Sequence, residues 1–196
     1  MGTMLSQIAP MLRSRQDSFV LVSMAAGIAM ADIRRMAGGD YPVIRIMPNM
    51  PVSAGMGMIL FDATENVSEG AIEIFLRSMA FAGCLDRLPE KLIDAGSALS
   101  GCGPAFVSLF VEALADGAVA CGLPRQQALQ YAAQTVAGTA KMLAESVQHP
   151  AALKDAVCSP GGSTIAGVAA MEQGGFRAAT MEAVISAYER TLELGK

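Results

Sequence analysis

The stretch Val43-Ile44-Arg45-Ile46-Met47-Pro48-Asn49-Met50-Pro51, VIRIMPNMP, decides the fold of the first half of the chain. Its first five residues form an apolar, β-branched run, which is typical of a buried strand. Two prolines around an asparagine then end the strand in a tight turn. Further β-like runs lie at residues 19–22, 58–61 and 84–88.

Helical segments separate these runs. Residues 28–37 predict a short helix closed by Gly38 and Gly39. Ser68 is suited to cap a second helix, which has apolar residues at helical spacing and stops at Gly83. The alternation of strand and helix predicts an α/β domain with a mainly parallel sheet.

The pattern changes from about Pro89, because every later apolar segment has helical spacing. One predicted helix begins at Gly103-Pro104 and buries the large residues Phe106, Leu109, Phe110 and Leu114. Further helices are predicted near residues 125–147, 151–157, 164–173 and 177–194. Faces rich in Ala, Gly and Met are hard to hide in about a hundred residues, so we expect a partner subunit to cover them.

Composition excludes several classes of partner. With 53% hydrophobic and 16% charged residues the chain has a sizeable core, and a net charge of −4 without any Trp argues against nucleic acid. No apolar run reaches the roughly 18 residues of a membrane span, and no signal-peptide pattern opens the chain. We therefore expect a cytoplasmic protein without a membrane partner.

The four cysteines are widely spaced, lack a C-x-x-C motif and sit among apolar or small residues. This pattern predicts buried, reduced thiols. The chain has a single histidine, His149, so no metal site is predicted.

Five motifs, taken in order, resemble the pyrroline-5-carboxylate reductase family, whose members make proline by reducing a cyclic imine with NAD(P)H. The similarity runs from about Met4 to the C-terminus, with departures at Met50 (usually Thr), Cys102 (commonly Ser) and Phe106 (commonly Tyr). The motifs are Ser23-Met24-Ala25-Ala26-Gly27, residues 43–51, Leu99-Ser100-Gly101-Cys102-Gly103-Pro104-Ala105-Phe106, Asp116-Gly117 with Gly122-Leu123-Pro124, and Ser159-Pro160-Gly161-Gly162-Ser163-Thr164.

One motif of nucleotide-binding domains is missing, since no G-x-G-x-x-G follows a strand. The chain begins instead in what resembles the middle of a helix, with Leu5, Ile8, Met11 and Leu12 on one face. The resemblance therefore implies that the N-terminal part of a dinucleotide-binding domain is absent. It implies that residues 1–89 are the C-terminal portion of a Rossmann-like NAD(P)-binding domain. Residues 90–196 would be an all-helical dimerisation and substrate-binding domain.

The Ser159–Thr164 loop is the expected substrate site. Its glycines let backbone amides approach a ligand, and Ser163 or Thr164 opens a helix whose free amides favour a carboxylate. By resemblance, the catalytic Thr164 hydroxyl contacts the substrate near its nitrogen, and the Gly162 and Ser163 amides hold the carboxylate. Ser159 and Ser100 are further candidate substrate contacts. The alternative is an ordinary turn followed by a helix with Ser163 as its N-cap.

The expected cofactor residues follow two strands, at the edge where α/β sheets bind ligands. By resemblance, Ala25, Ala26, Gly27, Pro48 and Asn49 line the nicotinamide and ribose of NADP or NAD, and we expect NADPH to be favoured. The Asn49 side chain either bonds the cofactor or only shapes a turn between prolines.

The resemblance predicts reduction of 1-pyrroline-5-carboxylate to L-proline, the last step of proline biosynthesis, by a dimer or a ring of dimers. Two alternatives stay open. A β-hydroxyacid dehydrogenase would need a catalytic lysine, for which Lys141 and Lys154 are available without a suitable motif. The chain would otherwise be a catalytically silent oligomerisation fragment that does not bind its dinucleotide.

Overall fold

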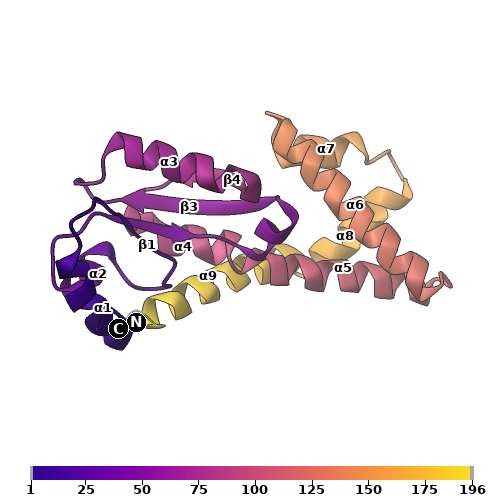
Figure 1. Cartoon of the computed structure of the whole chain (residues 1–196). Helices are drawn as coiled ribbons and strands as arrows, with labels where there is room; N and C mark the ends of the chain where they lie inside the picture. The colour runs from indigo at the N-terminus through magenta and orange to yellow at the C-terminus, as the bar shows by residue number, and fades with distance from the viewer. Residues whose placement is uncertain (1, 195–196) are drawn as a thin grey trace. The chain divides into compact units, whose positions relative to one another are not determined.

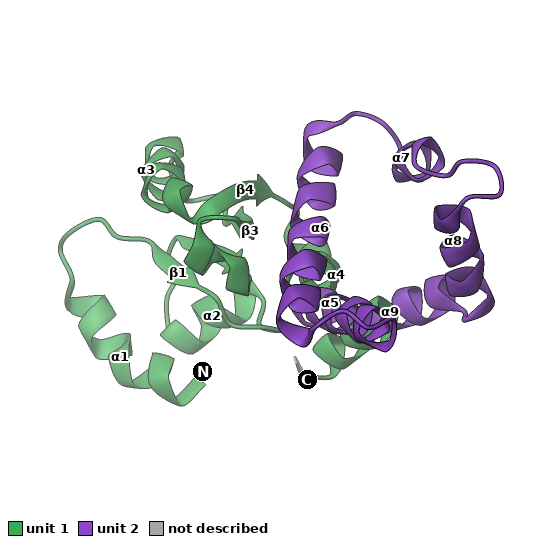
Figure 2. Ribbon diagram, turned by 90° about the vertical axis from the view of Figure 1, so that its right-hand side faces the viewer, with its two compact units in different colours: residues 1–104, 184–196 green, residues 105–183 purple. Residues whose placement is uncertain are grey.

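The computed structural model describes residues 2–194, which form two compact units (Figure 2). The first unit holds the residues up to 104 and those from 184 onwards, and the second holds residues 105–183. Two helices, α5 (Gly103–Ala120) and α9 (Phe176–Leu194), contribute residues to both units. The compact units do not divide at residue 90, since α4 (Glu90–Ser100) belongs to the first unit. The domain boundary that the sequence predicts there stays a prediction.

The first unit is built on a four-stranded sheet in the order β1-β2-β3-β4. Its strands are β1 (Leu21–Ser23), β2 (Val43–Met47), β3 (Gly57–Ala63) and β4 (Gly83–Arg87). The β1/β2 and β3/β4 pairs are parallel, but β2 and β3 are antiparallel, so the sheet is mixed. Only residues 48–56, with the short helix η1 (Met50–Ala54), connect β2 to β3. A parallel crossover needs a dozen or more residues, so this connection reverses the chain.

Helices cover both faces of the sheet (Figure 1). On one face lies α3 (Glu69–Met79), followed by η2 (Ala80–Ala82), over a core that includes Ile44, Ile59 and Phe75. On the other face lie α1 (Gly2–Ser14), α2 (Met30–Ala37) and α4.

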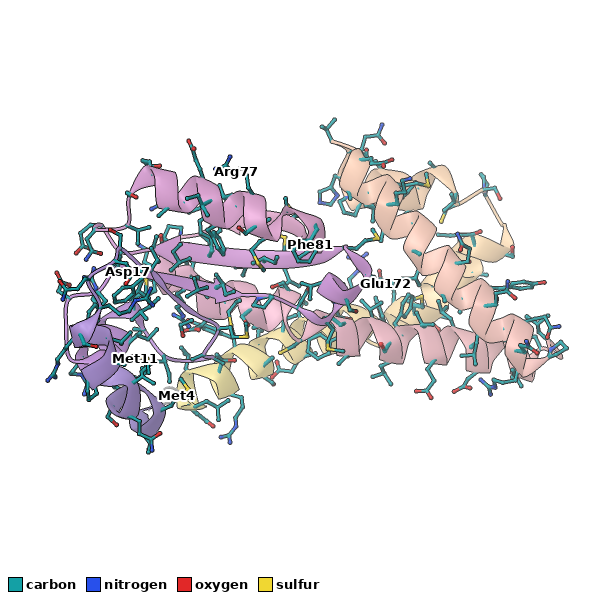
Figure 3. The ribbon with its side chains drawn as sticks, in the orientation of Figure 1. Met4, Met11, Asp17, Arg77, Phe81 and Glu172 are labelled. Carbon is teal, nitrogen blue, oxygen red and sulfur yellow. The ribbon has the colours of Figure 1, made fainter. Side chains whose placement is uncertain are left out.

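The expected ends of two helices are confirmed. The Ser68 hydroxyl accepts a hydrogen bond from the Ala71 amide at 3.3 Å, which caps α3. Gly38 ends α2 in the left-handed region, with φ 74°. The N-terminal helix α1 buries Leu5 and Leu12 of the expected face, together with Ala9. Met11 was expected to pack but is 66% exposed, and it projects from α1 together with Met4 (Figure 3).

The second unit is helical throughout, and alanines make up its small core. Besides parts of α5 and α9 it contains α6 (Arg125–Glu145), α7 (Pro150–Ala156) and α8 (Ser163–Gln173). Ala115, Ala128 and Ala132 form the buried cluster. The prediction that α5 buries its large apolar face is wrong for the single chain, since Leu109 is 68% exposed. Alanines pack these helices closely, and many of the larger side chains remain exposed.

Two further expectations concern surface chemistry. The cysteines are free, but Cys84 and Cys121 are exposed and Cys102 and Cys158 are partly exposed, so the prediction of buried thiols is wrong. Residues 90–120 are long and apolar enough to cross a membrane by length and composition alone. The expected absence of a membrane partner therefore stays a prediction.

A pair of facing glycines starts the β3/β4 pairing and yields a test of the fold. Gly83 has φ 137°, and a Cβ on it would lie 2.2 Å from the Gly57 carbonyl oxygen. We expect Gly83→Ala to lower the free energy of unfolding by at least about 2 kcal/mol, because it adds backbone strain to a clash. Gly70→Ala is the control, since Gly70 lies in the first turn of α3 with nothing within 4 Å of its added Cβ. Equal urea midpoints for the two variants would contradict this account.

Candidate functional site

The ends of β1 and β2 bring the expected cofactor residues to one edge of the sheet. The two strands are parallel, and Ser23 pairs with Arg45, so residues 24–27 and 48–50 leave the sheet side by side. The Ser23 hydroxyl accepts a hydrogen bond from the Ala25 amide at 3.3 Å. Gly27 has φ 69°, a left-handed conformation that favours glycine. Such an edge is where α/β sheets bind ligands.

Both polar atoms of the Asn49 side-chain amide are hydrogen-bonded within the protein. Its Oδ1 accepts a hydrogen bond from the Met58 amide, and its Nδ2 donates to the Ser100 carbonyl, each at 2.9 Å. These bonds support the interpretation that Asn49 shapes the turn. A side-chain contact between Asn49 and a cofactor stays a prediction.

Ser100 ends α4 and joins this edge through its carbonyl. Its Oγ is buried and has no hydrogen-bond partner among residues 2–194. Because a buried hydroxyl without a partner costs free energy, most such groups in proteins are bonded. Ser100 therefore has a free donor and acceptor beside this edge of the sheet.

Arg45 is a residue to which the sequence analysis gave no role. Its side chain is only 3% exposed, and its Nη2 donates to Asp94 Oδ1 at 2.6 Å. Its Nη1 lies 3.6 Å from Glu90 Oε1. Its Nε has no partner within the described part of the chain. The available signal was a charged residue in the middle of the apolar strand VIRIM, which predicts either an exposed edge or a buried pair.

Glu90 connects this buried arginine to the start of α2. Its Oε1 accepts a hydrogen bond from the Met30 amide at 2.6 Å, and Met30 is the first residue of α2. The Glu90 amide donates to Asp62 Oδ2 at 2.8 Å. Asp62 in turn pairs with Arg87 at 3.5 Å.

The Ser159–Thr164 loop lies in the second unit and prepares the start of α8. Gly161 is left-handed with φ 67°, and the Gly162 amide donates to the Ser159 carbonyl at 3.0 Å. A Cβ on Gly162 would lie 2.3 Å from Ser159 Oγ, so the turn is tight.

Gly162, and not Ser163, is the N-cap of α8, which corrects one of the two interpretations left open. Ser163 and Thr164 are instead the first two helical residues, and both are exposed. Gly162 has no side chain with which to cap this helix. The first amides of α8 therefore face solvent and can accept an anion.

The structure thus gathers the predicted site residues in two sets. Ser159, Gly162, Ser163 and Thr164 lie together in the second unit. The first unit holds Ala25, Ala26, Gly27, Pro48, Asn49 and Ser100.

Charged groups of the helical region have ordinary surface roles. Lys141 lies 3.8 Å from Glu145, one helical turn away. A hydrogen bond to Asp155 raises the pKa of the partly exposed Lys154 ammonium. Asp116 pairs with Arg125. His149 accepts a hydrogen bond from the Ala151 amide at Nδ1 and so caps α7. Over residues 2–194 no three His, Cys, Asp or Glu side chains gather in a way that would hold a metal.

Comparison with curated proteins finds relatives from several kingdoms. The pyrroline-5-carboxylate reductase of Synechocystis is 45% identical over 90% of this chain and 66% of its own length. That of Arabidopsis thaliana is also 45% identical, over 90% of this chain and 64% of the relative. That of Escherichia coli is 39% identical over 100% of this chain and 72% of the relative. The chain therefore spans about two thirds of the length of these curated relatives.

Solved structures agree with these relatives. The pyrroline carboxylate reductase of Plasmodium falciparum, solved with NADP bound, matches with a TM-score of 0.91 and 32% identity. The match covers 100% of this chain and 77% of the other. The pyrroline-5-carboxylate reductase of Coxiella burnetii matches with a TM-score of 0.89 and 30% identity, covering 100% of this chain and 72% of the other.

A family model also matches the helical part of the chain. The model for pyrroline-5-carboxylate reductase dimerisation covers residues 90–194. These residues include α4 to α9, which carry most of the exposed large apolar side chains of the described chain. The α/β and all-α parts, the family match and the relatives agree, and the chain belongs to the pyrroline-5-carboxylate reductase family.

Proposed function

We propose that this chain works in the reduction of 1-pyrroline-5-carboxylate to L-proline with NAD(P)H, the last step of proline biosynthesis. The observation that carries the proposal is identity of 39–45% with reductases of a cyanobacterium, a plant and an enterobacterium, over at least 90% of the chain. The same comparisons favour a reductase over a β-hydroxyacid dehydrogenase.

The proposed substrate site is the Ser159–Thr164 loop. The substrate carries a carboxylate, and the Ser163 amide at the start of α8 suits that group. The Gly162 amide donates to the Ser159 carbonyl within the chain, so it would have to share that hydrogen bond with the carboxylate. The Thr164 hydroxyl, one residue further along α8, would bond the ring nitrogen and hold or pass the proton that nitrogen gains. Ser159 would support the loop, and the Ser100 hydroxyl would be a further substrate contact because it has no internal partner.

The proposed coenzyme site is the strand-end edge, with NADPH preferred to NADH. The small residues Ala25, Ala26 and Gly27 leave room for a flat ring, and Pro48 and Asn49 flank them. The Plasmodium falciparum relative was solved with NADP bound, which supports the choice of coenzyme. When bound, the coenzyme supplies the hydride, and the protein supplies position. Asn49 is bonded to Met58 and Ser100, so it would act mainly by fixing the backbone of this edge.

The proposed assembly is a homo-oligomer formed through the helical region. The dimerisation model over residues 90–194 supports it. So do exposed apolar side chains, which a second copy of the chain would remove from water. They include Leu109, Leu129, Tyr131, Met142, Met181 and Ile185. A cytoplasmic location stays a prediction.

The first test asks whether the chain reduces the imine. The chain alone is compared with a joined form, in which it is linked to the part of the Escherichia coli relative that it does not span, a part that the resemblance assigns to dinucleotide binding. We expect the joined form to make proline, faster with NADPH than with NADH. Absence of proline formation by the joined form would refute the reductase proposal, and faster turnover with NADH would refute the coenzyme preference.

The same two proteins also test the alternative that the chain is a catalytically silent fragment that does not bind its dinucleotide. NADPH fluorescence is titrated with each form. Binding by the joined form and none by the chain alone would mean that the isolated chain is an oligomerisation fragment. Binding by both would exclude that alternative.

The second test concerns Thr164. In the joined form we expect Thr164→Ala to lower kcat by about a hundredfold, because a positioned proton donor or acceptor contributes that much. The Kd for NADPH should change little, because Thr164 is assigned to the substrate. Thr164→Ser keeps the hydroxyl and should recover most of the turnover. Unchanged kcat in Thr164→Ala would remove the residue from its proposed role.

A further inference from the structure

The buried Arg45 directs its contacts to a single helix, α4. Its Nη2 lies 2.6 Å from Asp94 and its Nη1 lies 3.6 Å from Glu90, while its Nε remains without a partner in the described structure. Burying a guanidinium is costly, and a hydrophobic residue of similar size would often serve stability as well or better. What an arginine adds is orientation, since its planar fork fixes the groups that it bonds.

Glu90 links the ion-paired helix α4 to α2, which begins close to the proposed coenzyme edge. The Met30 amide opens α2 and has no acceptor inside the helix, so the Glu90 carboxylate caps α2 from another element. A negative charge at a helix N-terminus is favourable. The bond joins residues 60 positions apart in the sequence. It therefore fixes where α2 begins relative to the sheet.

The turn at residues 25–27 is held at both of its ends by this arrangement. Before the turn, Ser23 pairs with Arg45 in the sheet and accepts a hydrogen bond from the Ala25 amide. After the turn, Met30 is bonded to Glu90. At the other end of α4, the Ser100 carbonyl accepts a hydrogen bond from Asn49. One helix thus bonds both Asn49 and Met30, the residue that opens α2 shortly after the turn at residues 25–27.

We propose that Arg45 and Glu90 are positioning residues of the reductase: they place the turn at residues 25–27 against the coenzyme without touching it. The inference rests on the proposed function and on the coenzyme edge assigned there. Asp94 anchors Arg45 from the middle of α4, so that the Arg45 guanidinium is held while Glu90 reaches Met30. A small displacement of a positioning element costs up to about a hundredfold in rate.

The test compares Glu90→Ala with Glu90→Gln and with a matched control. Glutamine keeps an oxygen acceptor for the Met30 amide, whereas alanine removes it. Glu69→Ala is the control, because Glu69 is also the first residue of a helix in the same unit but is exposed. All variants are made in the chain and in the joined form.

In the joined form we expect Glu90→Ala to raise the KM for NADPH about tenfold and to lower kcat, as misplacement of the coenzyme predicts. The KM for the imine should stay within about twofold of that of the unmodified joined form, because the proposed substrate loop is not part of the displaced turn. Glu90→Gln should recover most of the loss, and Glu69→Ala should match the unmodified protein. Arg45→Lys should resemble Glu90→Ala, because an ammonium lacks the fork geometry.

A second measurement needs neither coenzyme nor activity. Hydrogen exchange of the Met30 amide in the chain itself should be at least about tenfold faster in Glu90→Ala, as expected for an amide that loses its acceptor. Equal exchange and equal KM for NADPH in Glu90→Ala and Glu69→Ala would overturn the inference. Inactivity of the unmodified joined form would instead refute the proposed function, so the two failures are distinguishable.

Discussion

A guanidinium buried in a sheet has to be neutralised, and the architecture of the first unit follows from how Arg45 is neutralised. Both of its carboxylate partners come from α4, so this helix must lie against the face of β2 and β3. Gly96 permits the approach, because a Cβ at that position would lie 2.5 Å from the Leu60 side chain. The close packing of α4 on β3 and the ion pairs of Arg45 thus require each other. The ends of the same helix then reach α2 and the turn after β2.

The second unit follows another rule, in which small residues do the packing. Alanines let α5 and α6 approach closely, and the core they form is too small to shelter the larger side chains. Such a unit gains little from its own hydrophobic burial. The proposed partner subunit would add to its stability, because apolar surface removed from water is the main driving force of association. The family model for dimerisation, which matches this region, agrees with a unit that packs through small residues and exposes many larger apolar ones.

Local patterns in the sequence were sufficient for most elements of the fold. The strand at residues 43–47 was predicted with its observed bounds, because an apolar run between turn residues has few other uses. The reversal between β2 and β3 was missed, since strand direction depends on the length of the connection and not on the strand itself. The cap of α8 was misplaced by one residue, because both serine and glycine suit that position.

The site was harder to predict than the fold. The loop at residues 159–164 and the turns after β1 and β2 were selected through the family resemblance, and their individual roles remain predictions. Arg45, Glu90 and Asp94 were not selected, because their connection is visible only after α4 packs on the sheet. Asn49 illustrates a different limit: its pattern fits both a ligand contact and a turn, and its bonds to Met58 and Ser100, which favour the turn, are visible only in the structure.

Glycine at the cap of α8 leaves the first amides of that helix uncommitted. A serine or aspartate at position 162 would be a tethered competitor, present at high effective concentration beside every anion that approached. With glycine, the helix lacks the stability that such a cap provides. An anionic ligand would then not compete with a capping side chain at position 162 for the first amides. The ligand would then complete the helix, so that occupancy and local order would rise together.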